Sequence, residues 1–275
     1  MSDPVFVRLG TKPAPYPDDV RERLDRDADL IVARYSPPEQ PDSKMSRSAL
    51  LPLLHLVQSE EGYVSPTGIE FCAQRLGLTG AEVAAVSTFY SMYRREPTGD
   101  YLVGVCTNTL CAVMGGDAVH NALRDHVADD DSLVTVTHIE CNAACDYAPV
   151  VMVNWEFFDN QTPETARTIV DDLRSGREVV PTRGASLMTF RETERVLAGF
   201  PDERLGAVHA GGQPGDPTLA GLRVAHDKGM TAPAVSEATD SGSAPLGSES
   251  AAAAATTKDK PAPAPSASVP PEKGR

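Results

Sequence analysis

VCTNTLCAVMGG, at residues 105–116, and IECNAACDYAPVVMVN, at residues 139–154, each carry a pair of cysteines beside an expected strand. Four residues lie between the cysteines of the first pair, and three between those of the second. Cys106 ends one expected strand, and Cys141 follows the next. Neighbouring strands of one sheet would bring both loops to the same edge. We therefore expect four thiols, Cys106, Cys111, Cys141 and Cys145, to converge.

Several kinds of site use paired cysteines. A structural zinc site has two to four residues between ligands, and both pairs lie within that range. A [2Fe-2S] cluster takes two thiolates on each iron, and two pairs on two loops match that requirement. A redox-active dithiol of the thioredoxin type needs two residues between its cysteines, which neither pair has. The spacing alone leaves zinc and iron–sulfur chemistry open.

Small residues surround the four cysteines. Gly115 and Gly116 close the first stretch, and Ala112, Ala143 and Ala144 adjoin the cysteines. Such residues let backbone N–H groups approach a bound group closely. A fifth cysteine, Cys72, lies in an expected helix away from both loops. It is interpreted as a core residue, because free cysteine is among the most buried residue types.

Composition narrows the classes of function. The chain has 275 residues, of which 41% are hydrophobic, enough to bury a core. A net charge of -14 disfavours nucleic-acid binding, which needs clustered Lys and Arg. The opening MSDPVFVRLG has no signal-peptide pattern, and the apolar run ALLPLLHLV is too short to span a bilayer. We expect a cytoplasmic location without membrane insertion, where disulfides are disfavoured.

The chain is expected to have four parts. Residues 1–43 are an N-terminal extension with one helix over 18–35, and residues 44–96 form a helical bundle. Residues 97–185 form an α/β domain, in which a small mixed sheet has helices packed on it. Residues 186–275 are rich in Pro, Ala and Gly and are expected to be extended or disordered.

Capping residues and β-branched runs locate the individual elements. The expected helices span 46–61, 65–78, 79–93, 117–127 and 162–176, with Ser65, Thr79 and Thr162 as N-caps and Glu82 completing a capping box. The expected strands span 99–106, 132–139 and 148–154, with a hairpin continuing over 154–160.

The two cysteine stretches resemble the ligand loops of one known family. Their spacing is similar to that of the E subunit, the 24 kDa [2Fe-2S] protein, of NADH:quinone oxidoreductase (respiratory complex I). LLPLLHLVQSEEGYVS and VSTFYSMYRREPTG, at residues 50–65 and 86–99, resemble the family's first bundle helix and the segment that joins its two parts. The resemblance covers roughly residues 45–185 and does not extend to the C-terminal tail.

The resemblance implies a fold, a cofactor and partners. The fold would be a thioredoxin-like [2Fe-2S] ferredoxin domain preceded by a small helical bundle. Cys106 and Cys111 would bind one iron, and Cys141 and Cys145 the other. The partners would be the flavoprotein, or F subunit, which binds NADH and FMN, and the iron–sulfur G subunit. The chain would exchange single electrons with that FMN, in the peripheral arm on the cytoplasmic face of the membrane.

Other functions stay open at this point. Related proteins serve NAD-linked hydrogenases and formate dehydrogenases, and the cysteines do not distinguish these hosts. A structural zinc-binding interaction module is the alternative from a different class. No catalytic acid, base or nucleophile stands out, so the isolated chain is expected to have no turnover of its own.

Overall fold

The computed structural model describes residues 13–35, 44–128, 131–211 and 214–231. The first twelve residues of the expected N-terminal extension and the expected tail beyond residue 231 lie outside these ranges. The chain divides after Val224 into two units, and the fold given below is that of the first. In the described ranges, no helix is long and apolar enough to cross a membrane.

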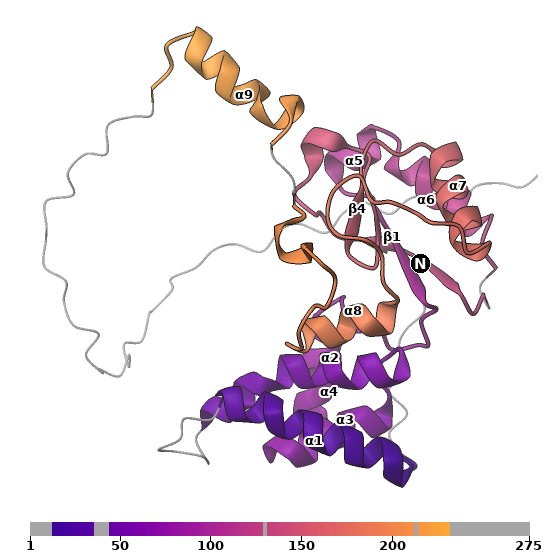
Figure 1. The fold of residues 1–275 in the computed structure, drawn as a ribbon, viewed down its shortest axis with the longest axis vertical. Helices are drawn as coiled ribbons and strands as arrows, with labels where there is room; N and C mark the ends of the chain where they lie inside the picture. Colours follow the sequence, from indigo (N-terminus) through magenta and orange to yellow (C-terminus); the bar gives the residue numbers. More distant parts are fainter. Residues whose placement is uncertain (1–12, 36–43, 129–130, 212–213, 232–275) are drawn as a thin grey trace, which may run out of the picture. The chain divides into compact units, whose positions relative to one another are not determined.

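Helices make up most of the described chain (Figure 1). The α-helices are α1 (Asp18–Tyr35), α2 (Leu50–Glu61), α3 (Pro66–Leu76), α4 (Gly80–Phe89), α5 (Thr109–Val113), α6 (Gly116–Arg124), α7 (Pro163–Arg174), α8 (Phe190–Leu197) and α9 (Asp216–Asp227). Short 3-10 helices span Lys44–Ala49 (η1), Cys145–Tyr147 (η2) and Ala207–His209 (η3). The strands are β1 (Tyr101–Cys106), β2 (Val134–Ile139), β3 (Val151–Val153) and β4 (Glu156–Phe158).

The four strands form one mixed sheet in the order β2-β1-β3-β4. β1 runs parallel to β2, with Cys106 opposite Ile139, and antiparallel to β3. Helices α6 and α7 lie side by side and pack on this sheet (Figure 1). Their apolar faces, including Val119, Leu123 and Val170, join Val103 and Val105 of β1 in one core. The mixed sheet with packed helices is as expected from the sequence.

The N-terminal helices form a bundle with a core of its own. Ser65 accepts a hydrogen bond from the Gly68 backbone N–H at 3.0 Å, and Thr79 and Glu82 form the expected capping box. Such caps satisfy the free N–H groups of a first helical turn. Helix α1, which the sequence placed in the extension, contributes Leu24 and Ile31 to the bundle core. The bundle therefore includes this helix.

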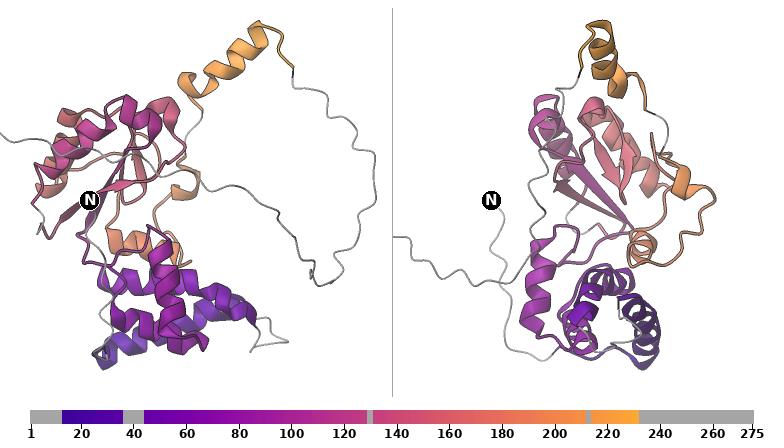
Figure 2. Two further views of the ribbon diagram at one scale, coloured as in Figure 1. Left: turned by 180° about the vertical axis from the view of Figure 1, so that it is seen from behind. Right: turned by 90° about the vertical axis from the view of Figure 1, so that its left-hand side faces the viewer.

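The expectation of an extended or disordered chain from residue 186 is wrong for α8 and also for α9. Thr189 and Glu192 form a capping box, and the buried Phe190 fixes the helix to its surroundings. Helix α8 packs along α2, as both views of Figure 2 show. Composition over the whole tail hid this helix, because eight residues with one apolar face contribute little to an average over ninety.

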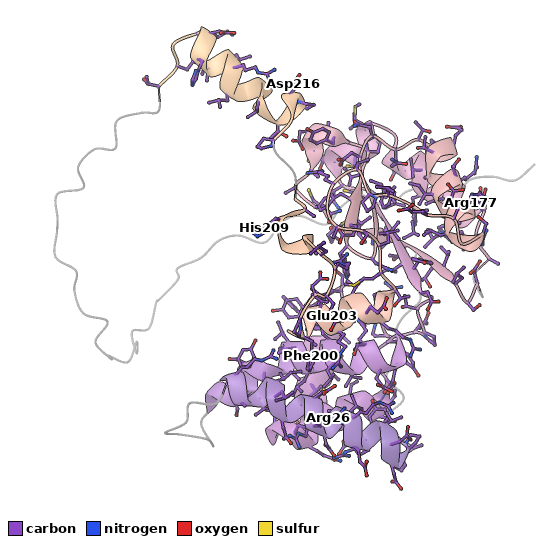
Figure 3. All side chains as sticks on the ribbon, viewed as in Figure 1. Arg26, Arg177, Phe200, Glu203, His209 and Asp216 are labelled. Carbon is purple, nitrogen blue, oxygen red and sulfur yellow. The ribbon has the colours of Figure 1, made fainter. Side chains whose placement is uncertain are left out.

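A buried polar pair joins α8 to the bundle. Glu194 is fully buried, and its Oε2 lies 2.6 Å from Nδ1 of His55 on α2. Near the end of α8, Arg195 donates to the buried Asp27 of α1 at 2.8 Å and lies over the ring of Phe200. Phe200 itself lies against the bundle (Figure 3). These contacts make α8 a structural part of the bundle.

We expect Glu194→Ala to lower the free energy of unfolding by about 3 kcal/mol, because the variant leaves His55 without its buried partner and opens a void. Urea unfolding followed by circular dichroism measures the change. Glu203→Ala, at an exposed carboxylate further along the same segment (Figure 3), is the matched control and should change stability little. Equal stability of the two variants would contradict a structural role for the pair.

Candidate metal centre

The first cysteine pair is buried where β1 ends. Cys106 is the last residue of β1, and its N–H donates to the carbonyl oxygen of Val150 at 3.1 Å. Cys111 lies in α5, a five-residue helix inside the first loop that the sequence did not indicate. Both cysteines pack with Val150 in a small apolar cluster of their own. The fold thus shields this pair from water on one side.

The second pair lies on the chain between β2 and β3 and is exposed. Cys145 begins the short helix η2, which ends at Tyr147. The backbone of Ala143 adopts a left-handed conformation, with φ of 54°, and its N–H donates to Cys141 Sγ at 3.4 Å. This conformation is unfavourable for residues other than glycine, and such residues occur preferentially at functional sites.

The structure brings the four thiols together as two pairs. Cys111 lies close to Cys106, and Cys145 lies close to Cys141. The two pairs are also near each other, since charge on Cys145 acts on Cys111 and charge on Cys106 acts on Cys145. Across the described ranges, no three histidine, cysteine or acidic side chains lie close enough to one another to hold a metal ion.

Burial and neighbouring sulfurs control the protonation of these thiols. Burial raises the pKa of Cys111 to about 11, while an N–H from Val150 that donates to the sulfur acts in the opposite direction. Partial desolvation raises the pKa of Cys145, and the adjacent Cys141 adds to the rise. A metal that binds here must displace these protons, since the thiolate is the ligand.

The first loop makes a close turn, and the second loop has a buried donor that fits a bound group with sulfur atoms. A Cβ at Gly116 would lie 2.5 Å from the Cys106 carbonyl oxygen and 2.8 Å from that of Cys111, so only glycine allows this close turn. In the second loop, Nδ2 of Asn142 is buried and has no hydrogen-bond partner within the described chain. A buried donor without an acceptor is costly, and a nearby sulfur would supply one.

Sequence reasoning singled out the four thiols and Gly116 but missed Asn142; at Gly116 the close approach is to backbone carbonyl oxygens and not the expected one to sulfur. The signal was present, because Asn142 is a polar residue directly after Cys141 in an otherwise small-residue loop. Cys72, by contrast, is fully buried in the bundle core as expected. Burial raises the pKa of Cys72 far above its ordinary value, so this thiol stays protonated.

Comparison with known proteins agrees with this arrangement. Residues 31–174 match the profile of the family described as thioredoxin-like [2Fe-2S] ferredoxin. The NADH-quinone oxidoreductase E subunit of Mycobacterium tuberculosis is 59% identical over 248 residues, which cover 84% of this chain and 94% of that protein. NADH-quinone oxidoreductase subunit 2 of Thermus thermophilus is 34% identical over 169 residues, covering 59% of this chain and 88% of that protein.

Solved structures give only a distant likeness. A crystal structure of NAD+-reducing [NiFe]-hydrogenase aligns with a TM-score of 0.41 at 18% identity, over 46% of this chain and 23% of that chain. A likeness this remote does not separate one host complex from another. The extent and identity of the sequence matches show that this chain belongs to the thioredoxin-like [2Fe-2S] ferredoxin family and, within it, to the family of NADH-quinone oxidoreductase E subunits.

Proposed function

We propose that this chain holds a [2Fe-2S] cluster on Cys106, Cys111, Cys141 and Cys145 and exchanges single electrons with the FMN of an NADH-binding partner protein. The observation that carries the proposal is that two thiol pairs lie on two loops at one edge of the sheet, near enough for charge on one pair to act on the other. Family membership supports it, because curated relatives are named as subunits of NADH-quinone oxidoreductase.

Each pair would hold one iron, Cys106 with Cys111 and Cys141 with Cys145, since a [2Fe-2S] cluster takes two thiolates on each metal. Such a cluster accepts and releases one electron at a time, whereas NADH delivers two. The chain's own task is to hold the thiolates and to set the potential. Hydrogen bonds to sulfur and solvent exposure are its means. The backbone N–H of Ala143 already donates to the Cys141 sulfur.

An exposed apolar patch beside the first cysteine loop suits a protein partner. The docking patch consists of Leu110, Val113 and Met114, on and directly after α5. Val113 is 79% exposed and Met114 57%. Apolar side chains gathered beside a redox centre are typical of an interaction site. We assign this patch to the NADH- and FMN-binding flavoprotein, within a peripheral arm on the cytoplasmic face that also contains the larger iron–sulfur protein.

The host complex and the metal are separate questions. The 59% identity to a quinone oxidoreductase component favours that host over an NAD-linked hydrogenase or formate dehydrogenase. A structural zinc module differs by its chemistry, because zinc has no redox activity. The iron, sulfide and zinc content of the anaerobically purified chain, together with EPR after dithionite reduction, tests this choice directly.

Wild-type protein should contain about two irons and two sulfides and give an S = 1/2 signal on reduction, as one [2Fe-2S] cluster requires. We expect Cys141→Ser to lose most of this iron and signal, because one iron then lacks a thiolate. Cys72→Ala is the matched control and should retain both, since that thiol lies in the bundle core. Bound zinc in place of iron in the wild-type chain would disprove the proposal.

Gly116→Ala should weaken the first loop by about 1–3 kcal/mol, the range of overpacking, because its Cβ overlaps two backbone oxygens. Thermal melts and iron content of the purified variant measure the effect. Gly80→Ala is the matched control: Gly80 also begins a helix, but a Cβ there meets only Ile69, at 3.9 Å. If both variants melt at the same temperature and keep their iron, the close turn at Gly116 is not required for stability or for iron binding.

A charge in the docking patch should weaken association with the flavoprotein. We expect Met114→Glu to raise the Kd for this partner at least about tenfold, the usual result of placing a charge in an apolar contact. Calorimetry with the purified flavoprotein measures the Kd. Leu30→Glu, at an exposed leucine of α1, tests the same change in the bundle and should leave binding unchanged. An unchanged Kd for Met114→Glu would exclude this surface.

A further inference from the structure

Arg183 lies beyond the residues that match the family profile, yet it reaches the second cysteine loop. Arg183 follows α7 and pairs with β4. The Phe157 N–H donates to the Arg183 carbonyl oxygen at 3.3 Å, and the Thr182 N–H donates to the Phe157 carbonyl oxygen at 2.9 Å. This single bridge places Arg183 beside the edge strand β4. It holds the Arg183 backbone at a fixed position on the sheet.

Two kinds of contact hold the Arg183 side chain. Its Nε and Nη2 each donate to one carboxylate oxygen of the buried Asp159, both at 2.8 Å. Its Cζ lies 4.5 Å from the ring centre of Phe157 and 5.0 Å from that of Tyr147. A guanidinium that is paired through two bonds and lies over aromatic rings loses little freedom by holding this geometry. Donation to Asp159 raises the pKa of Arg183 above the ordinary value, so it stays charged.

Tyr147 connects this side chain to the cysteine loop. Tyr147 ends η2, the single turn that begins at Cys145, and its N–H donates to the Ala144 carbonyl oxygen at 3.1 Å. Its own carbonyl oxygen accepts from the N–H of Asn160, next to Asp159, at 2.8 Å. The turn that carries Cys145 is thus fixed through both the backbone and the ring of Tyr147.

We propose that Arg183 is a positioning residue for the second cysteine loop, acting through the Tyr147 ring to hold the turn that carries Cys145. The proposal rests on the proposed function, since the loop must hold its thiols for a cluster. Arg183 touches no cysteine itself. Its contribution is to keep an exposed loop in the geometry that retains iron. The apolar cluster that shields Cys106 and Cys111 does not include Cys145, which is exposed.

Arg183→Lys is the first test, because lysine keeps the charge but has no planar fork to pair with Asp159 and lie over both rings. In the full-length chain, this variant should lose iron to a chelator about fivefold faster than wild type, a factor that corresponds to the loss of one cation–π contact. Visible absorbance measures the rate of iron loss.

Arg174→Lys is the matched control for this change. Arg174 forms a comparable pair with Asp131. The side chains of Arg174 and Asp131 are 29% and 16% exposed, and those of Arg183 and Asp159 are 30% and 7% exposed. Within the described chain, Arg174 does not lie over an aromatic ring. This variant should lose iron at the wild-type rate. Equal rates for the two lysine variants would overturn the proposal.

Substitution of Tyr147 tests whether Arg183 acts by positioning the cysteine loop or only by pairing with the edge strand β4. Tyr147→Phe keeps a ring beneath the guanidinium and should behave as wild type, whereas Tyr147→Leu should lose iron as fast as Arg183→Lys. The double variant with Arg183→Lys should be no faster than either single variant, because both remove the same contact. Additive rates would show that the two residues act independently and would overturn the proposal.

Amide hydrogen exchange of the cluster-free chain gives a readout that needs no iron. Arg183→Lys should speed exchange at residues 143–148, and Arg174→Lys should not. If wild-type protein holds zinc or no metal, the proposed function fails, and this exchange still decides whether Arg183 positions the loop. Unchanged exchange at these residues in Arg183→Lys would overturn the positioning role.

Discussion

The parallel pairing of β1 with β2 is the constraint on which the rest of the site depends. It ends both strands at the same edge, with Cys106 opposite Ile139, so the two cysteine loops begin side by side. Gly104 makes this packing possible, because a Cβ there would lie 2.6 Å from Cγ2 of Ile139. β3 then returns antiparallel along β1 and brings Val150 against Cys106. The thiols converge because the sheet is ordered this way.

A buried amide holds the far end of the same sheet. Asn154, just after β3, accepts from the Leu102 N–H at 2.8 Å and donates to the carbonyl oxygens of Asp100 and Met188 at 2.9 and 2.8 Å. The Phe190 N–H also donates to the carbonyl oxygen of Asp100, at 2.7 Å. The segment that leads into α8 is therefore tied to the beginning of β1. Strong, fully paired hydrogen bonds connect the bundle to the sheet at this point.

Local sequence signals were sufficient wherever a local interaction decides the structure. Ser65, Thr79 and Thr162 cap their helices as expected, since a capping hydrogen bond needs only the next three residues. Helix α8 also begins with a local signal, the Thr189–Glu192 capping box, but the average composition of the tail obscured it and its burial depends on partners far away in sequence. Phe190 is buried by packing that no local pattern encodes, and Glu194 meets His55, 139 residues earlier.

The candidate site divides in the same way. The cysteines could be identified because spacing is a local property, and the close turn at Gly116 follows from its place in the loop. The support of the second loop could not be identified. Arg183 contacts Tyr147, Phe157 and Asp159 only because β4 pairs with a segment after α7, and that pairing is a tertiary event. Sequence reasoning therefore gives the candidate ligands of a site more readily than the residues that position them.

The uneven burial of the two cysteine pairs has a consequence for the redox centre. The inner pair, Cys106 and Cys111, lies in an apolar cluster, whereas Cys141 and Cys145 face water. Solvent stabilises the additional negative charge of a reduced cluster, so an exposed outer side favours reduction. A partner that covers the outer pair and the docking patch removes that water and makes reduction harder, unless it supplies hydrogen bonds or positive charge. On a chain with a net charge of -14, a partner surface rich in Arg or Lys would supply both. In the proposed function, the potential that matters would therefore be a property of the complex, and the free chain would give only its starting value.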